Sequence, residues 1–481
     1  MRRAAPLVAL VATSLPAMLL AQPYDTPPPA APPRAFVIPA PAVATLDNGL
    51  RLVVAQRSTL PLVTVQLLVR SGAETDPALL GGLADLTAEL LTKGTATRTA
   101  PQIADAAEAL GGALDSGAAW DRSQVSMTIT RPQVGAALAL IADVVLNPRF
   151  LQAELDRTRR QALDHLSVSL GEPGTLARMA VDRAAFGAGP YGHSAEGTPA
   201  SLKRIKRADV VALHKAWYRP DNATLIFSGD IDMTQARVLA DKAFGAWARP
   251  AAALPPPRAE EPAIKSPAPV LIAMEGAGQA GIAVAAPSIA RGAPDYYAGV
   301  IANALLGGGY SSRLNQELRI RRGLTYGVGS SLDSRRRGGV WRISAQTKNE
   351  SAADFVQVTL DEVRRVREAA PPADELAARK LTVIGAVSRR FETTSSLANV
   401  LAGFEATGIA PVEITRSIEA LGAVTGDDVV AFARRQWDPS TFAIVVAGEA
   451  QIADALRQKH PGLRVVAQDD LDLDRAELTR P

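Results

Sequence analysis

Hydrophobic residues recur along this chain with two periods, one typical of strands and one typical of helices. Alternation of apolar and polar positions predicts strands at residues 50–55, 62–69 and 125–129, since residues two apart share one face of a strand. Apolar residues three and four apart predict helices at residues 82–95, from 101 to about 110, 134–146, 151–169 and 298–306. Within the second strand, Val63, Val65, Leu67 and Val69 would line one buried face. This mixture predicts an α+β fold with antiparallel strands.

A pattern near the middle of the chain returns near its end. The segment DVVALHKAWYRPDNATLIFSG begins at Asp209 and DVVAFARRQWDPSTFAIVVAG begins at Asp428, and the two match without a gap at six positions. Each copy reads as a helix, an aromatic residue (Tyr218 or Trp437), a proline turn and an apolar strand. We therefore expect an internal duplication, with two homologous α/β-sandwich halves.

The first 21 residues have the layout of a secretory signal peptide. Arg2 and Arg3 precede a short apolar stretch, and the small residue Ala21 stands before Gln22, where we expect cleavage. A retained anchor is the open alternative. The chain has no cysteine, so it has neither a lipid-modified cysteine at the cleavage site nor disulfides. These features predict a bacterial periplasmic protein.

Proline-rich segments set the expected domain boundaries. Residues 22–43 read as a semi-rigid tether and residues 249–268 as an interdomain linker. The two halves would then span residues 44–248 and 269–467. Residues 468–481 carry several aspartates and are expected to be a solvated acidic tail without a structural role.

Composition excludes some classes of function. The 481 residues have a net charge of +3, and only 5% are aromatic, so the chain lacks the strongly basic, base-stacking character of nucleic-acid-binding proteins. No uncharged apolar run of about 18 residues follows the signal, so no integral membrane segment is expected after its removal.

Several separate motifs resemble those of one peptidase family. They are TLDNGLRLVV, GLADLTAELLTKGT, YRPDNATLIFSGD and LLGGGYSSRLNQELRIRRGLTYGV, in that order. Together they are similar to the pitrilysin/insulinase-like zinc metallopeptidases, which include mitochondrial processing peptidase. The resemblance extends from about Ala44 to Val466. It implies duplicated α+β halves that close, clam-like, on a chamber for peptides.

The chain departs from that family at the zinc site. In active members the helix at residues 82–95 carries H-x-x-E-H, in which two histidines hold zinc and the glutamate activates water. Here those three positions are Asp85, Ala88 and Glu89, and the third ligand is expected near Thr175, with Glu172 close by.

The rest of the chain does not supply the missing ligands. It has no cysteine and four histidines, none of them four residues apart, so we expect no metal here. Asp85 and Glu89 are expected to form a surface or interface acidic pair, and whether they bind a hard cation stays open.

The second half contains the arginine and tyrosine that the family resemblance leads us to expect. Family members complete their site with an arginine and, seven positions later, a tyrosine, and Arg319 and Tyr326 have that spacing. The tyrosine hydroxyl would stabilise an oxyanion and the arginine would bind the substrate backbone. From the residues alone, Arg319 could equally be a solvated cation beside other arginines, and Tyr326 a strand aromatic.

Gly307, Gly308 and Gly309 form a short glycine-rich loop that two interpretations fit. No G-K-[ST] follows, so the loop is not a phosphate loop. It could end the preceding helix, or it could contact substrate, as the resemblance to non-catalytic subunits of processing peptidase implies.

These observations favour a non-catalytic subunit of a periplasmic heterodimeric zinc peptidase. The chain would bind no cofactor itself, and a homologous partner carrying H-x-x-E-H would hold the zinc and hydrolyse peptides. The alternative is a catalytically inert peptide-binding or scaffold protein of the same fold. An independent hydrolase with another centre has little support, because G-x-S-x-G and Cys/His arrangements are absent.

Overall fold

Each half of the chain builds a six-stranded sheet with the same plan. The computed structural model describes residues 39–258, 264 and 267–480. The first sheet has the spatial order β1 (Ala42–Thr45), β2 (Arg51–Gln56), β6 (Ala223–Gly229), β3 (Leu62–Val69), β5 (Ser123–Thr130) and β4 (Asp115–Ala118). The second has the order β12 (Arg464–Ala467), β7 (Val270–Ala273), β11 (Ala443–Gly448), β8 (Ala280–Ser288), β10 (Gly339–Thr347) and β9 (Val328–Ser334).

Strand directions match between the two sheets except at one edge. The pairs β2 with β6 and β7 with β11 are parallel, while β3 and β8 run antiparallel to both of their neighbours. At the differing edge, β1 is antiparallel to β2, whereas β12 is parallel to β7. The predicted α+β duplication is therefore confirmed.

Helices follow the strands in both halves. The first half has α1 (Leu83–Leu90), α2 (Ala100–Ala109), α3 (Val134–Leu146), α4 (Gln152–Leu170), α5 (Pro173–Phe186), α6 (Pro199–Arg204), α7 (Arg207–Trp217) and α8 (Met233–Phe244). The second has α9 (Tyr296–Leu306), the π-helical η5 (Asn315–Arg321), α10 (Ala352–Glu368), α11 (Ala373–Arg389), α12 (Thr394–Thr407), α13 (Glu413–Ala423), α14 (Gly426–Gln436) and α15 (Ala453–Lys459).

The repeated sequence segment has the same structure in both halves. It forms α7 followed by β6 in the first copy and α14 followed by β11 in the second. The matching aspartates also have the same role. Asp209 accepts a hydrogen bond from the Lys206 amide at 2.7 Å, and Asp428 accepts one from the Thr425 amide at 2.8 Å. Both carboxylates thus bind an otherwise unpaired N–H at the start of a helix.

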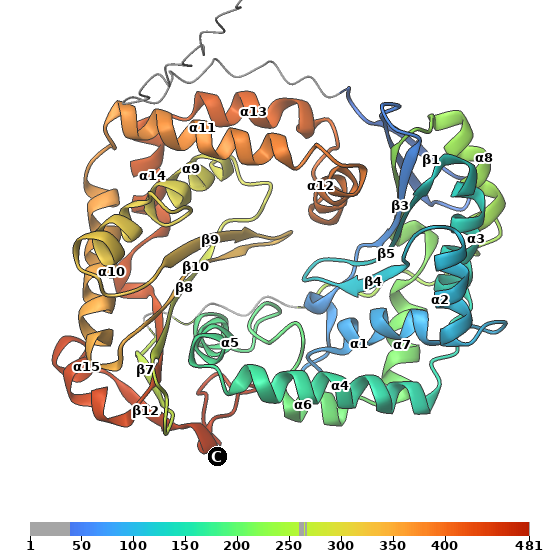
Figure 1. The fold of residues 1–481 in the computed structure, drawn as a ribbon. Helices are drawn as coiled ribbons and strands as arrows, with labels where there is room; N and C mark the ends of the chain where they lie inside the picture. Colours follow the sequence, from blue (N-terminus) through green and yellow to red (C-terminus); the bar gives the residue numbers. More distant parts are fainter. Residues whose placement is uncertain (1–38, 259–263, 265–266, 481) are drawn as a thin grey trace, which may run out of the picture. The chain divides into compact units, whose positions relative to one another are not determined.

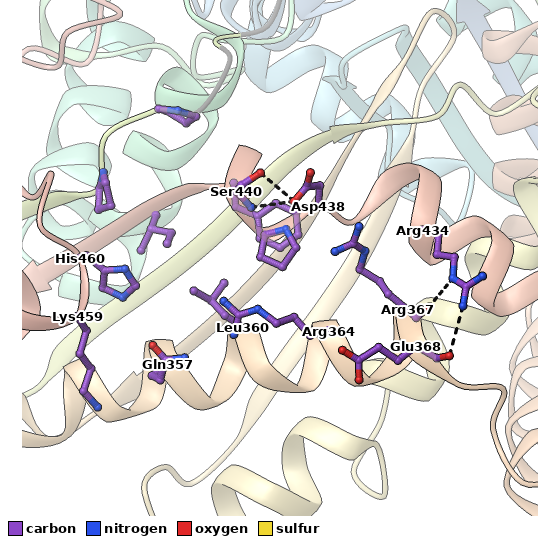
Figure 2. Close-up of a pocket in the computed structure, with 15 residues that line it drawn as sticks. Gln357, Leu360, Arg364, Arg367, Glu368, Arg434, Asp438, Ser440, Lys459 and His460 are labelled. Carbon is purple, nitrogen blue, oxygen red and sulfur yellow. Dashed lines mark hydrogen bonds between the residues drawn. The ribbon is translucent and has the colours of Figure 1, made fainter.

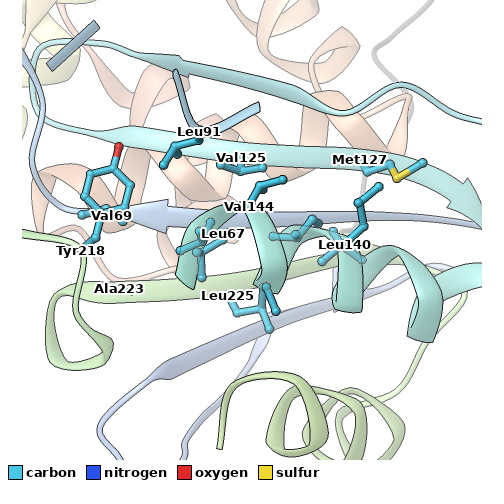
Figure 3. Close-up of a cluster of buried hydrophobic side chains, with 14 of the residues drawn as sticks. Leu67, Val69, Leu91, Val125, Met127, Leu140, Val144, Tyr218, Ala223 and Leu225 are labelled. Carbon is cyan, nitrogen blue, oxygen red and sulfur yellow. The ribbon is translucent and has the colours of Figure 1, made fainter. Parts of the chain in front are cut away.

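The predicted apolar face of β3 lies in the core of the first half. Val63, Val65, Leu67 and Val69 are each at most 1% exposed and pack with residues of α3, β5 and β6. Figure 3 shows part of this cluster, in which Leu67 lies close to Val125 and Val144. The alternation in the sequence therefore identified this face correctly.

The opposite faces of the two sheets are covered by exchanged helices. On α5, which belongs in sequence to the first half, Leu176 and Val181 pack on residues of β7, β8 and β11. On α12, which belongs to the second half, Leu397 and Leu401 pack on β2, β3 and β6 around Leu68. Figure 1 shows α5 beside β8 and α12 beside β3. Each half thus completes the core of the other.

Polar contacts fix both exchanged helices. The Arg342 guanidinium of β10 donates to Asp182 on α5 at 2.6 Å, and Arg51 of β2 pairs with Glu405 on α12 at 2.9 Å. Thr64 of β3, which alternation would place on a solvent face, is 3% exposed and donates to Thr394 at 2.9 Å. The polar positions of β3 are therefore interface positions.

Two boundary predictions need correction. β1 begins at Ala42, inside the predicted tether, because Ala42–Thr45 pairs with β2 as an edge strand. Residues 468–480 are not a solvated tail: Leu478 is 1% exposed, and Asp474 accepts from Thr198 at 2.9 Å and pairs with Arg204 at 2.8 Å.

Other predictions concern residues that the structure describes only in part. The predicted signal peptide and most of the tether lie outside the described residues. Within residues 39–258, 264 and 267–480, no helix is both long and apolar enough to cross a membrane.

Candidate functional site

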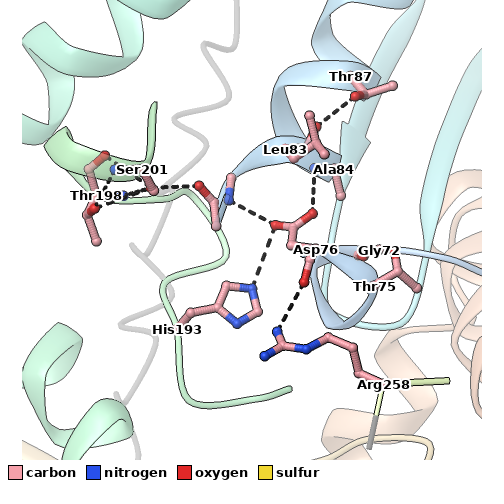
Figure 4. A network of polar contacts seen from close by, with 12 residues as sticks. Gly72, Thr75, Asp76, Leu83, Ala84, Thr87, His193, Thr198, Ser201 and Arg258 are labelled. Carbon is pink, nitrogen blue, oxygen red and sulfur yellow. Dashed lines mark hydrogen bonds and ion pairs between the residues drawn. The ribbon is translucent and has the colours of Figure 1, made fainter. Parts of the chain in front are cut away.

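The helix that carries the acidic pair, α1, is held at its first turn by a buried aspartate. Asp76 is fully buried, and its carboxylate accepts from the Gly82 amide at 2.9 Å and the Ala84 amide at 2.8 Å. His193 Nε2 lies 3.6 Å from the same carboxylate, as Figure 4 shows. Burial raises the pKa of Asp76 above its ordinary value, although the contact with His193 and the bonds from the two amides act against this rise. Asp76 thus binds two N–H groups at the start of α1, where the N-cap residue Gly82 offers no side chain to do so.

A second contact places the loop at residues 194–197 against the start of α1. Gly82 has a φ of +89°, and a Cβ there would lie 2.9 Å from the carbonyl oxygen of Glu196. Ser201 also donates to the Gly81 carbonyl at 2.7 Å. Only glycine allows this close approach, which brings Glu196 to the acidic side of α1.

Asp85 and Glu89 face a cavity of about 420 Å³. Its other polar lining includes His165 and Gln161 of α4 and Glu196. Of this pair, which was expected at a surface or an interface, Glu89 is exposed and Asp85 is half-buried in the wall of the cavity. Burial first, and then the charges of Glu89 and Glu196, raise the pKa of Asp85 to about 7.

Replacing Asp85 with Asn should stabilise the protein at pH 8 and change its stability little near pH 4. Because the folded-state pKa is raised, the folded protein holds this proton more tightly than the unfolded chain does. Stability is therefore lost as the pH rises from about 4 to about 7, and Asp85→Asn removes that loss. We expect a gain of about 2 kcal/mol in the free energy of unfolding at pH 8, measured by denaturant titration.

Glu108→Gln is a matched control, because Glu108 is exposed on the neighbouring helix α2. It removes the same charge without relieving burial, so its effect should be small at both pH values. An Asp85→Asn variant that is no more stable than the parent at pH 8 would contradict the raised pKa of Asp85.

The residues present do not fit zinc. The cavity offers one imidazole, His165, where structural and catalytic zinc sites use several imidazole or thiolate ligands. Ala88, at the position of the catalytic glutamate, is fully buried, and its carbonyl oxygen accepts from Ser116 at 2.6 Å. Among the described residues, no three His, Asp, Glu or Cys side chains come close enough to share a metal ion.

The expected place of a third ligand was wrong. Glu172 and Thr175 stand at the start of α5, which packs on the second sheet, and neither lines the cavity. α4 contributes His165 there instead. His165 and Glu196 give no signal in the sequence, because neither lies in a ligand motif, and only the packing of α4 and of the 194–197 loop brings them to α1.

Arg319 and the glycine loop meet through an aromatic side chain. The Arg319 guanidinium lies 4.3 Å from the centre of the Tyr310 ring, and Tyr310 directly follows Gly309. The other arginines of the segment, Arg321 and Arg322, both pair with Glu317 and hold its pKa below the usual range. Arg319 has no carboxylate partner among the described residues. It is thus distinct from its neighbours, within a π-helix of the kind often found at functional sites.

Local packing explains two of the three glycines in the loop. A Cβ on Gly307 would lie 2.6 Å from Ser330 Oγ, and one on Gly308 would lie 2.7 Å from the Cα of Ala304, whereas Gly309 has open space. The Gly307 amide donates to the Asn303 carbonyl at the end of α9. Ending the helix therefore accounts for Gly307 and Gly308, and the role of the loop in substrate contact stays a prediction.

Tyr326 stands in solvent at the mouth of another cavity. Its side chain is 89% exposed, and the cavity, of about 340 Å³, is also lined by Arg178 of α5 and by Gln279 and Gln346. Thr325 donates to the Gln346 carbonyl at 2.7 Å and so ties this loop to β10. Arg319 does not line this cavity, so the arginine beside Tyr326 here is Arg178, which comes from the first half.

A further cavity, of about 870 Å³, lies against α10 and α14 (Figure 2). Three of its basic side chains are engaged: Arg364 pairs with Asp361, Lys459 pairs with Asp354, and Arg434 donates to the Arg367 and Glu368 carbonyls. Arg434 thereby caps the C-terminus of α10. We assign this cavity no function.

The chain has two homologous halves, and α1 stands at the position of the zinc-binding helix. These two features define a metallopeptidase-like protein. The family model described as Insulinase (Peptidase family M16) matches residues 51–199, and the model described as Peptidase M16 inactive domain matches residues 204–382. The chain belongs to this insulinase/pitrilysin-like family.

Relatives and solved structures agree with this assignment. A protein of Mycobacterium bovis named as an uncharacterized zinc protease is 29% identical over 400 residues, which cover 82% of this chain and 90% of the relative. The structure named peptidase M16 inactive domain from Pseudomonas fluorescens has a TM-score of 0.79 at 25% identity, covering 85% of this chain and 98% of its own. A protease from Helicobacter pylori has a TM-score of 0.80 at 18% identity, covering 85% of this chain and 99% of its own, and shows the fold alone.

Proposed function

We propose that this chain is a non-catalytic subunit of a periplasmic, heterodimeric zinc peptidase. It supplies Arg319, Tyr326 and the Gly307–Gly309 loop to a homologous partner that carries H-x-x-E-H and hydrolyses peptides. The observation that carries the proposal is the contrast between two positions. The zinc helix has lost its ligands, while Tyr326 is 89% exposed and its hydroxyl has no hydrogen-bond partner among the described residues.

The exposed hydroxyl suits the proposed task. A tyrosine O–H that points into solvent can donate to the oxygen of a substrate carbonyl as negative charge develops on it, and such a donor lowers the barrier to hydrolysis. Arg319 has no ion pair, so its guanidinium keeps donors available for substrate carbonyl oxygens. The partner's zinc would supply the activated water, which this chain cannot provide.

The chain alone should bind no stoichiometric zinc and show no chelator-sensitive peptidase activity. The physical reason is the donor set around Asp85, which offers a single imidazole. Metal analysis of the purified chain, followed by peptide cleavage assays with and without the partner, tests this. The partner to use is a chain of similar length with H-x-x-E-H encoded by a neighbouring gene.

The outcomes separate the proposal from its alternative. Activity that requires both chains supports the shared peptidase. A stable complex whose partner is fully active without this chain would make the chain a scaffold. One tightly bound zinc in this chain alone would overturn the proposal.

A further inference from the structure

A cavity of about 600 Å³ lies where the two halves meet, next to the cavity of Asp85 and Glu89, with which it shares Ala119. Aromatic rings from both halves line it: Trp120, Tyr296, Tyr297, Phe391 and Phe404. Its size and largely apolar lining are typical of sites for small organic ligands, which often lie at domain interfaces.

Arg122 brings a positive charge without an ion pair into this cavity. Its side chain is partly buried, and burial lowers its pKa. The Nε atom is inaccessible to solvent and has no hydrogen-bond partner, and no carboxylate of the described residues forms an ion pair with the guanidinium. A ligand in the cavity therefore reaches Arg122 through its two terminal nitrogens, and an anion there would pair with a partly buried charge that has no ion pair of its own.

The acids that line the cavity are already engaged elsewhere. Asp121 accepts from the Tyr191 hydroxyl and from the Arg336 amide, each at 2.8 Å. Asp333 pairs with Arg335 at 2.7 Å. Neither carboxylate forms an ion pair with Arg122, although the negative charge of Asp121 raises the pKa of Arg122 against the effect of burial.

A second cation adds to the positive potential. The Arg291 guanidinium lies 3.8 Å from the centre of the Tyr296 ring and 5.4 Å from that of Phe404. Arginine that stacks on rings keeps its in-plane N–H donors free for an anion. The cavity thus combines apolar walls with four arginines: Arg335, which pairs with Asp333, and Arg122, Arg291 and Arg390, which have no ion pair among the described residues.

We propose that this cavity binds a small carboxylate that carries an aromatic or apolar group. Arg122 binds the carboxylate, and the surrounding rings hold the apolar group. The carboxylate comes either from a free organic acid or from the C-terminus of a short peptide, since both present the same chemistry. The site does not depend on the zinc-bearing partner or on Tyr326.

Calorimetric titration of the full chain with paired probes tests the proposal. N-acetyl-phenylalanine carries the carboxylate, and N-acetyl-phenylalaninamide has the same ring without the charge. A tetrapeptide ending in phenylalanine, with a free or an amidated C-terminus, forms the second pair. We expect at least one of the two acids to bind about 10- to 100-fold more tightly than its amide, the scale of a charge-assisted hydrogen-bond pair.

Two variants and a control assign the site. Arg122→Gln should reduce the affinity for the acid to that for the amide and leave the amide unchanged. Gly403→Leu should weaken both, because a Cβ on Gly403 lies 3.6 Å from Arg122 Nη1 and a leucine there extends into the cavity. Arg160→Gln removes an exposed arginine on α4 and should change nothing.

The two probe pairs identify the source of the carboxylate. Preference for the free acid over the tetrapeptide indicates a metabolite site, and the reverse indicates capture of a peptide C-terminus. Equal affinity for acid and amide in both pairs, no binding of either acid at millimolar concentration, or full binding by a folded Arg122→Gln variant would overturn the proposal.

Discussion

Residues 39–258 and residues 264–481, produced as separate proteins, should each fail to fold cooperatively, and together they should recover the native structure. The reason is the exchange of α5 and α12. Without the second half, the buried side chains Val53, Leu68 and Ile226 of the first sheet lose Leu397, Leu401 and Phe404 of α12. Each fragment would expose three of these six side chains, which at about 1.5–2 kcal/mol each costs it on the order of 5 kcal/mol. That loss is comparable with the net stability of a marginally stable domain.

Thermal unfolding followed by circular dichroism measures the outcome. Each fragment alone should give a broad transition or aggregate, and the co-expressed pair should give one sharp transition near that of the intact chain. A protease site inserted between residues 258 and 264 is the control, because cleavage after folding should leave the two pieces associated. A fragment that unfolds sharply as a monomer would show that the halves are independent domains.

Tyr326→Phe in the complex with the zinc-bearing partner should lower kcat by about 10²-fold, the scale of removing one oxyanion donor. The side chain is 89% exposed, so Phe changes no packing and deletes only the hydroxyl. Assembly should therefore be unaffected, and a fall in turnover at constant complex mass isolates the transition-state hydrogen bond. Arg319→Ala should raise KM as well, because the guanidinium would bind the ground-state peptide.

Tyr310→Phe is the matched control for that experiment. Tyr310 is also exposed, at 64%, and Phe keeps the ring on which Arg319 stacks. We expect the turnover of this variant to equal that of the parent complex. If Tyr326→Phe and Arg319→Ala both leave turnover unchanged, the shared active site is wrong and the chain is a scaffold.

The sequence by itself determined the elements and the duplication. The alternation in β3 reflects a physical constraint, since residues two apart must share a face. The repeated segment predicted α7–β6 and α14–β11 because the same capping aspartate, proline and apolar strand occur in both copies. The loss of the zinc ligands also needed no structure, because residue identity alone removes the imidazoles.

Only the tertiary structure decided which surfaces meet. An amphipathic helix reveals an apolar face but not the sheet that receives it, so the exchange of α5 and α12 left no local signal. The pKa of about 7 at Asp85 depends on walls from α4 and the 194–197 loop, which are distant in sequence. Residues 468–480 dock on the first half, and Arg178 lies beside Tyr326. Both placements likewise depend on packing between segments that are distant in sequence. Burial and proximity are properties of the packed chain, and a pattern of residue types does not encode them locally.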